Sequence, residues 1–521
     1  MSQILASKQL RPSAQPTGPV SVPLSILDAG CARLATAGAI WTFDAPAAAD
    51  QDVLVNRLEA SFVTTLNDFP HWAGQLHWTP CRQGGLHTER FNRPMITYGS
   101  PHDPGVEWNV VRLSRRAGEV APEAATRAAG SQVWVANDFP QAELIASKTS
   151  LALQDLKTYQ DMPSMLVQVS LFEDGGFAVA IKMSHALADA SALLTFMHRW
   201  AANCRSLFGT GSEALDPPVF DPQLLDSKAA GTMDTQDPAL VAAARSLPLH
   251  RFDWWATEAK GYPSFLAPTT ENSRPSDPSL LEAAKNEPSS EPPWETWNMM
   301  APVTHAVIHF SGPQVEAIRG LARPTAPKCS RLDALLAHVW SGINRARGLA
   351  DDDDDVFLNV TLGIRSRVSP PLPDTFLGSP LILSHIASRG REASASDSSG
   401  LGTLAARVRA CLEVFTPDAV SAVLHEAIHT VSPQRLWRAF LGQRHVIVTS
   451  WLRLGVNEVD FIGNGTTPRY AHPIMPYMDG CMQVMDSAAG DGGMDVSLYL
   501  ESGAMTRLLE DDSLLRREPE E

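Results

Sequence analysis

The spacing of apolar residues predicts both strands and helices in the first half of the chain. Residues 165–172 and 177–184 are strand-like runs, and the EDGG between them supplies the glycines of a tight hairpin. In the second run large apolar residues alternate with small or polar ones, which is the period of a strand. From about 190 to 208 the apolar period becomes helical, and residues 58–76 predict a further amphipathic helix that ends in a turn.

The second half repeats this mixture after a change of composition. Residues 267–297 are rich in Pro, Ser and Glu without a sustained apolar period, so they predict a linker over the surface. A strand is expected at 303–311, a helix at about 332–347 and a strand at 356–362. The five aspartates at 351–355 could bind a cation, but like-charge runs are usually solvated loops. The pattern predicts α/β or α+β domains.

Length and composition support two domains. The chain has 521 residues, of which 44% are hydrophobic and 19% charged. These values are typical of a globular protein with more than one core. We expect an N-terminal tail (1–22), an N-terminal domain (23–225), a crossover or linker region (226–300), a C-terminal domain (301–505) and an acidic tail (506–521).

Charge and cysteine content exclude several classes of function. A formal net charge of -16 argues against binding to nucleic acid, which needs clustered Lys and Arg. The six cysteines are scattered without CxxC pairs, which favours reduced thiols. No segment has the length of a signal peptide core or a membrane span. We therefore expect a cytoplasmic protein with no membrane partner.

One candidate catalytic motif lies where a strand gives way to a helix. In S-H-A-L-A-D, His185 follows the predicted strand and Asp189 precedes the predicted helix. Histidine is suited to proton transfer near neutral pH. Each residue also has a structural interpretation, because Asp189 could cap the helix and His185 could be a hydrogen-bonded core histidine.

A second candidate segment, TSWLRLGVNEVDFIGNG, lies near the C-terminus. Thr449 and Trp451 would share one face of a strand and could offer hydrogen-bond donors to a cleft. An ordinary strand with a buried tryptophan is the alternative. Asp460 begins a glycine-containing turn and could simply form that turn.

A third motif competes with the first two. His425, Glu426 and His429 spell HEAIH, in which two histidines one turn apart could bind zinc and the glutamate could activate water. The residues that follow lack the glycine and third histidine of the extended metalloprotease pattern, and Pro433 interrupts the helix. A zinc hydrolase is therefore the less favoured alternative.

Several segments in fixed order resemble the BAHD acyltransferases and the related fungal secondary-metabolite transferases. That family carries HxxxD in mid-chain and DFGWG near the C-terminus, which correspond to residues 185–189 and 460–465. The similarity extends to LEASFVTTLNDFPHWAGQL, to SRLDALLAHVW and to GIRSRVSPPLPDTFLGSP. Two departures are that Ala190 replaces the usual glycine after HxxxD and that the DFGWG-like segment is longer and lacks its tryptophan.

The resemblance implies two chloramphenicol acetyltransferase-like domains, each a mixed sheet with flanking helices, with a channel between them. His185 would be the general base for acyl transfer to a hydroxyl or amine. Asp189 would pair with Arg365 and have a structural role. Trp451, with Thr449, would stabilise the tetrahedral oxyanion, and Asp460 would support the structure.

The resemblance also implies the ligands. Acyl-CoA would be a co-substrate rather than a permanently bound cofactor, with contacts at Ser330 and Arg331. The acceptor would be a small-molecule alcohol or amine, no metal would be needed, and the protein would be a monomer. A non-catalytic or condensation-type relative that binds small or carrier-tethered ligands is the alternative from another class.

Overall fold

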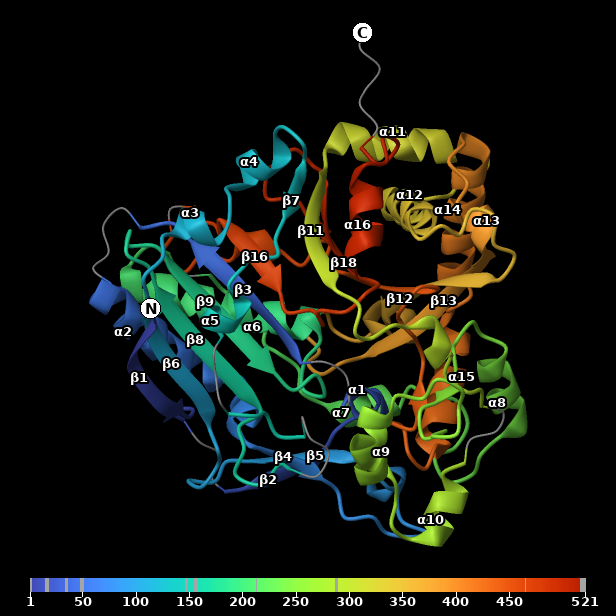
Figure 1. The fold of residues 1–521 in the computed structure, drawn as a ribbon. Helices are drawn as coiled ribbons and strands as arrows, with labels where there is room; N and C mark the ends of the chain where they lie inside the picture. The colour runs from blue at the N-terminus through green and yellow to red at the C-terminus, as the bar shows by residue number, and fades with distance from the viewer. Residues whose placement is uncertain are drawn as a thin grey trace.

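The computed structural model contains two large mixed sheets with helices packed against them (Figure 1). It describes residues 2–14, 18–32, 36–46, 51–145, 149–153, 158–211, 213–285, 289–463 and 465–515. Both sheets combine parallel and antiparallel pairs, which agrees with the predicted fold class.

The first sheet has six strands in the order β1-β6-β8-β9-β3-β16. Their bounds are β1 (Ser2–Leu10), β3 (Ala37–Phe43), β6 (Val106–Leu113), β8 (Met165–Leu171), β9 (Phe177–Met183) and β16 (Tyr470–Pro473). Strands β8 and β9 form the predicted hairpin. Helices α2 (Gln51–Leu66) and α6 (Ala190–Phe208) pack against each other, and the bounds of α6 confirm the helical period.

Aromatic side chains fill the core beneath this sheet. The Phe62 ring on α2 lies 5.2 Å from Trp108 of β6 and 5.0 Å from Trp200 of α6 between ring centroids. All three side chains have no exposed surface. Such tilted and edge-on contacts add to the burial of large apolar area, so α6 is held firmly with its first turn at the end of β9.

The second sheet has seven strands in the order β13-β12-β15-β17-β18-β11-β7. Their bounds are β7 (Val133–Val135), β11 (Val303–Phe310), β12 (Asp355–Gly363), β13 (Leu381–Arg389), β15 (His445–Ser450), β17 (Cys481–Asp486) and β18 (Met494–Glu501). Four long helices belong to this domain, namely α11 (Gly312–Ala322), α12 (Arg331–Ala346), α14 (Ser398–Glu413) and α16 (Ser502–Leu509).

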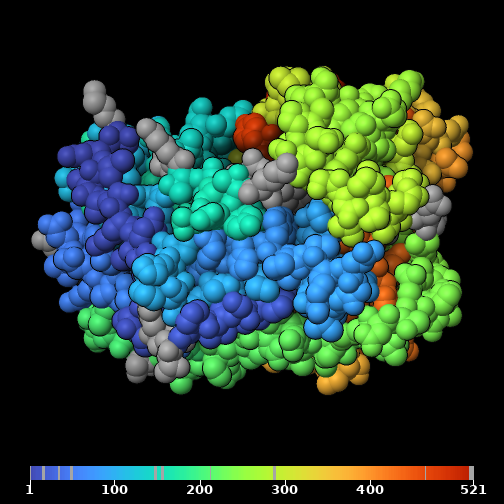
Figure 2. All heavy atoms as spheres, turned by 90° about the horizontal axis from the view of Figure 1, so that it is seen from below, coloured from blue at the N-terminus to red at the C-terminus, as the bar shows by residue number. Residues whose placement is uncertain are grey.

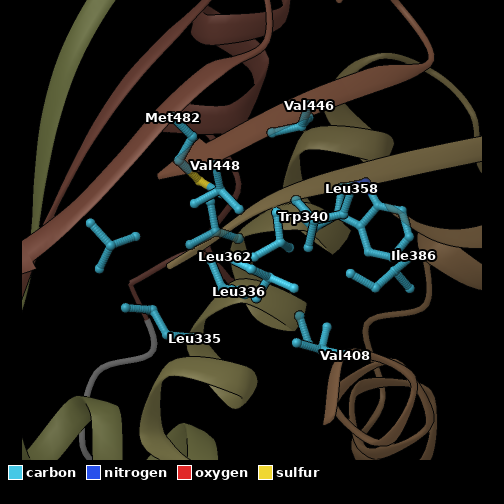
Figure 3. Packing of buried hydrophobic residues seen from close by; sticks show 14 of the residues in the cluster. Leu335, Leu336, Trp340, Leu358, Leu362, Ile386, Val408, Val446, Val448 and Met482 are labelled. Atoms are coloured by element: carbon cyan, nitrogen blue, oxygen red, sulfur yellow. The ribbon is translucent and has the colours of Figure 1, made fainter. Parts of the chain in front are cut away.

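Helix α12 is the centre of the second core. Leu336 and Trp340 on one face of α12 point towards Leu358 of the sheet, and Val408 of α14 closes the same cluster (Figure 3). The helix begins with the capping box of Ser330 and Asp333. The predicted helix at 332–347 is thus confirmed.

Two strands pair with the sheet of the other half of the chain. The predicted division into contiguous domains did not include this exchange. Strand β7 comes from the N-terminal half but pairs with β11, and β16 comes from the C-terminal half but pairs with β3 (Figure 1). Each crossing strand hydrogen-bonds the edge of the other domain's sheet. Buried backbone groups must be paired, so these exchanges join the two domains.

Two further predictions about the domain boundaries differ from the structure. Residues 2–10, expected in a tail, form β1 along the edge of β6, and Val20–Pro23 form β2. Figure 2 shows this dark-blue N-terminal chain packed on the first domain, with the yellow-green second half on the other side. The chain is ordered because edge strand β6 offers it a row of unpaired backbone groups.

The expected linker is also partly a packed structure. Residues 267–297 contain α9 (Ala267–Ser273) and α10 (Pro278–Ala283), although 286–288 lie outside the described residues. Trp294 and Trp297 are buried with Phe440 of the second domain. Isolated tryptophans carry no period, so composition alone missed this packing.

The remaining elements are short, except for α15 with 13 residues. The helices are α1 (Ile26–Cys31), α3 (Ala117–Val120), α4 (Ala124–Ala128), α5 (Gln141–Leu144), α7 (Pro222–Asp226), α8 (Pro238–Arg245), α13 (Gly390–Ala393) and α15 (Pro417–His429). The strands are β4 (Gln75–Trp78), β5 (Pro94–Tyr98), β10 (Phe252–Asp253) and β14 (Leu436–Trp437). The helix and turn predicted within 58–76 are confirmed as the second part of α2 and a 3-10 turn at Pro70–Ala73, and β4 begins at the end of this segment.

Candidate active site

His185 lies in the turn between β9 and α6, and its ring faces the second domain. Strand β9 ends at Met183, and the turn is closed by the amide of Leu187, which donates to the Ser184 carbonyl at 3.0 Å. The ring contacts Ser379, which lies two residues before β13 of the other domain. The histidine therefore stands between the two sheets.

The hydrogen bonds of His185 define which ring nitrogen carries the proton. The Ser379 hydroxyl donates to the backbone carbonyl of His185, and its oxygen lies 3.1 Å from Nδ1. Since that hydroxyl proton is already engaged, Nδ1–H is the donor to Ser379. No described residue bonds Nε2, so its lone pair is available. Burial lowers the pKa of His185, which keeps the ring neutral at pH 7.

Asp189 faces Arg365 rather than His185. Its carboxylate accepts from Arg365 Nη1 at 2.7 Å and Nη2 at 2.9 Å, and both side chains are buried. Asp189 Oδ1 also accepts the amide of Ala192 at 2.9 Å, so it caps α6. Arg365 donates further to the carbonyl of Phe376. The structure thus brings together the two residues that the sequence placed in one pair.

Asp28 belongs to this site, and the sequence analysis did not find it. Its Oδ1 accepts the amide of Ser379 at 2.6 Å, and Oδ2 accepts the hydroxyl of Ser25 at 2.7 Å. Burial raises the pKa of Asp28 to about 6. The SxxD capping box of Ser25 and Asp28 was the only available sequence signal, and it predicts a helix start rather than a site.

Gly378 allows the backbone before Ser379 to lie close to the carboxylate of Asp28. Its φ of +106° is unfavourable for other residues, and an added Cβ would lie 2.8 Å from Asp28 Oδ1. The Gly378 carbonyl also accepts the Asp189 amide at 3.0 Å. The Gly378–Ser379 segment therefore contacts His185, Asp189 and Asp28 at once.

The two oxyanion candidates lie at the end of β15. Thr449 is half-buried and shares a strand face with Ile447, which lines a cavity described below. Trp451 is 6% exposed and packs in the first domain's core with Ala186 and Leu187. A residue that directly follows a strand of the second sheet thus belongs to the same core as the two residues after His185.

Asp460 organises the loop after these residues. Its Oδ1 accepts the amides of Ile462 at 3.0 Å and Gly463 at 2.6 Å, and Arg205 donates to its carbonyl. This is a turn-forming role. Asn464 of the DFGWG-like segment lies outside the described residues.

Ser330 and Arg331 lie away from the residues around His185. Ser330 Oγ caps α12 by accepting the Asp333 amide at 3.1 Å. Arg331 contacts Glu316 and the carbonyl of Gly492. None of these contacts involves a residue near His185, so a role in coenzyme A binding stays a prediction.

The HEAIH residues are occupied by structural contacts. His425 Nδ1 lies 2.7 Å from the Ala230 carbonyl, and Nε2 accepts the Asp237 amide at 2.8 Å. Glu426 forms ion pairs with Arg251 and Arg245, and His429 Nε2 lies 3.2 Å from the Thr232 carbonyl. A zinc ligand needs a free nitrogen, so this geometry disfavours the zinc hydrolase alternative.

Two searches of the described residues bear on metals and membranes. They contain no group of three or more His, Cys, Asp or Glu side chains arranged to hold a metal ion. None of the helices in the described ranges combines the length and apolar character needed to cross a bilayer. Within the acidic run, Asp352 pairs with Arg444 at 2.8 Å and Asp353 pairs with Arg391 at 2.6 Å.

Two cavities meet at Pro476, and both receive residues from the two halves of the chain. One has a volume of about 560 Å³ and is lined by polar groups that include Lys182, His305 and Tyr499. The other has a volume of about 500 Å³ and is lined mainly by apolar side chains. Both volumes are in the range of small-molecule sites.

Comparison with known proteins identifies relatives across most of the sequence. The sequence model of the Transferase family matches residues 129–515. Acyltransferase AFT15-1 of Alternaria alternata is 27% identical over 538 residues, which cover 98% of this chain and 96% of the relative.

Solved structures share the whole architecture. Vinorine synthase superposes with a TM-score of 0.63 at 19% identity, covering 99% of this chain and 98% of its own. TRI101 of F. graminearum, solved with coenzyme A and deoxynivalenol, has a TM-score of 0.68 at 14% identity, covering 95% and 98%. The predicted two-domain fold is confirmed.

Proposed function

From the premise that this chain belongs to the Transferase family and is an acyl-CoA-dependent acyltransferase, we propose that His185 is its general base. The acceptor is a hydroxyl or amine of a small molecule. The observation that carries the proposal is the hydrogen bonding of His185, in which Nδ1 is fixed by Ser379 and Nε2 remains open.

The proton moves as follows in the proposed reaction. Nε2 takes the proton from the acceptor while the acceptor oxygen or nitrogen attacks the thioester carbonyl carbon. The tetrahedral intermediate collapses, the C–S bond breaks, and the proton on Nε2 passes to the sulfur of the departing coenzyme A. A neutral histidine is required at the start, and the lowered pKa of His185 favours that form.

The tetrahedral intermediate carries an oxyanion that needs a preorganised donor. Trp451 and Thr449 are the proposed donors because they lie at the end of β15, and Trp451 belongs to the same core cluster as Ala186 and Leu187, the two residues after His185. Loss of one such donor typically costs about 100-fold or more in rate.

Asp189 and Arg365 have a structural role in this proposal. Their ion pair ties the start of α6 to the second domain across 176 residues of sequence. Because Asp189 also bonds the Gly378 carbonyl through its amide, the pair fixes the segment that orients His185. It carries no proton in the reaction.

The donor and acceptor classes follow from the relatives. TRI101 of F. graminearum was solved in complex with coenzyme A and deoxynivalenol, so we extend acyl-CoA as co-substrate and a secondary-metabolite acceptor to this chain. Nearly full-length similarity to a fungal acyltransferase favours transfer over the condensation-type alternative.

The test measures release of free coenzyme A from a panel of acyl-CoA thioesters mixed with alcohols and amines. His185→Ala should be slower by roughly 100-fold or more, as expected for loss of a general base. His102→Ala is the matched control, because His102 is exposed and should leave the rate unchanged. Equal rates for wild type and His185→Ala would refute the role of His185.

A further inference from the structure

The apolar cavity opens beside the segment that orients His185. Cys31 of α1 lines it, and the Cys31 thiol also interacts with the Ser379 hydroxyl. Leu381, two residues after Ser379, lines it as well. A ligand in this cavity would therefore have one end near the Ser379 segment that holds the His185 ring.

The walls of the cavity are mainly hydrocarbon and aromatic. Trp254 and Trp437 stack with ring centroids 5.6 Å apart, and Trp297 meets Phe440 edge-on at 5.4 Å. Met299 adds a half-buried thioether. Such a surface favours apolar ligand area and offers little to the phosphates of a nucleotide.

Among the described residues that line the cavity, the cation Arg438 is already opposed by an acid. Arg438 has Glu426 as its neighbour, with Nη2 3.9 Å from Oε2. Glu426 is held in turn by Arg251 and Arg245. This network reduces the attraction of the cavity for an anion.

Gln434 is a lining residue of the apolar cavity with a buried polar side chain. Its Nε2 donates to the carbonyls of Ala29 and Asn92, which fixes the orientation of the amide. The side chain is 3% exposed, and within the described residues nothing donates to its Oε1. Buried acceptors are costly without a partner, so a ligand that supplies an N–H or O–H would satisfy this atom.

We propose that this cavity binds the acyl acceptor, and that the acceptor is an uncharged, largely hydrocarbon molecule with a hydrogen-bond donor for Gln434 Oε1 besides its reacting group. The inference rests on the proposed function, which supplies the reaction at His185. The other cavity at Pro476, whose lining includes the half-buried Lys182, remains for the donor.

The experiment measures binding of N-phenyl-1-naphthylamine, an uncharged fluorescent probe with one N–H, to the full-length protein. Met299→Asp should weaken binding about tenfold or more, because it places a charge in the apolar wall. Met300→Asp is the matched control, since Met300 is 84% exposed and should leave the affinity unchanged. Equal affinity of Met299→Asp and wild type would overturn the site.

A second measurement tests the contact of Gln434 by comparing two probes on the same protein, so a change in the stability of a Gln434 variant does not affect the result. The N-methylated probe lacks the N–H and should bind wild type about tenfold more weakly than the parent probe, as loss of one hydrogen bond predicts. Gln434→Met should bind both probes equally. Since a general loss of packing would weaken both probes alike, an unchanged ratio in Gln434→Met would refute the contact.

Two further arms separate this inference from the proposed function. His185→Ala should bind the probe like wild type, and neither coenzyme A nor decanoyl-CoA should displace it. Displacement by decanoyl-CoA alone would assign the cavity to the acyl chain and overturn the acceptor assignment. If wild type releases coenzyme A but the affinity for the probe does not depend on the cavity residues, only this inference fails. If the probe binds in the cavity but no acceptor is acylated, only the proposed function is contradicted.

Discussion

Breaking the ion pair of Asp189 and Arg365 should destabilise the protein strongly. The two N···O distances are 2.7 and 2.9 Å, and the side chains are 6% and 9% exposed. Removal of one member leaves the other charge buried with few partners, which costs about 3–5 kcal/mol. Asp189→Asn is the sharper change, because asparagine preserves the helix cap and removes the charge.

A double-mutant cycle separates the interaction energy of the ion pair from the effect of each single substitution. Asp189→Asn and Arg365→Met should each lower the free energy of unfolding by about 3 kcal/mol or more. The double variant should lose less than the sum by about 2 kcal/mol, because neither charge is left unpaired.

Urea unfolding followed by tryptophan fluorescence measures these free energies. Because two domains need not unfold together, the free energy of the first unfolding transition is compared between the variants. Arg391→Met is the control, since Arg391 pairs with Asp353 on the surface, where the two side chains are 60% and 71% exposed, and it should change stability by about 1 kcal/mol or less. Single losses below about 1 kcal/mol, or additive losses in the double variant, would refute the reasoning.

Three other perturbations have defined outcomes. Because burial lowers the pKa of His185, the acid limb of a kcat/KM–pH profile should lie below pH 6.5, and a limb above it would contradict a buried neutral base. Gly378→Ala should lower both melting temperature and kcat, since its Cβ would meet Asp28; an unchanged kcat would separate this turn from catalysis. Three clustered histidines have pKa values lowered by burial to about 2, 4 and 3, namely His250, His385 and His445. The unfolded chain binds their protons first, so stability should fall as pH decreases below 6.5, by about 2 kcal/mol each at pH 5. Urea titrations at pH 7 and 5 on wild type and on His250→Phe measure this, and an equal loss in both would exclude His250 as a cause.

Local sequence determined the elements that carry the candidate site. The hairpin of β8 and β9 and the helix α6 follow from periods of two and 3.6 residues, because burial of one face is a local pattern. His185 and Asp189 could be placed at the junction for the same reason. The order of motifs then indicated the family and, through it, the pairing of Asp189 with Arg365.

Other features needed the tertiary structure because they join residues far apart in sequence. Asp28 meets Ser379 across 351 residues, and Gln434 meets Ala29 across 405. The crossing strands β7 and β16 have no sequence period that names their partners, since any exposed sheet edge accepts a strand.

The sequence by itself thus determined which segments become strands and helices, and which histidine stands at a strand end with an aspartate one helical turn later. Only the tertiary structure decided that Ser379 fixes the proton on Nδ1, that Trp294 and Trp297 are buried rather than in a linker, and that an apolar cavity opens beside the base. The physical reason is that periodicity reports the burial of one element's face, whereas a site is formed by contacts between elements whose arrangement depends on the packing of the whole chain.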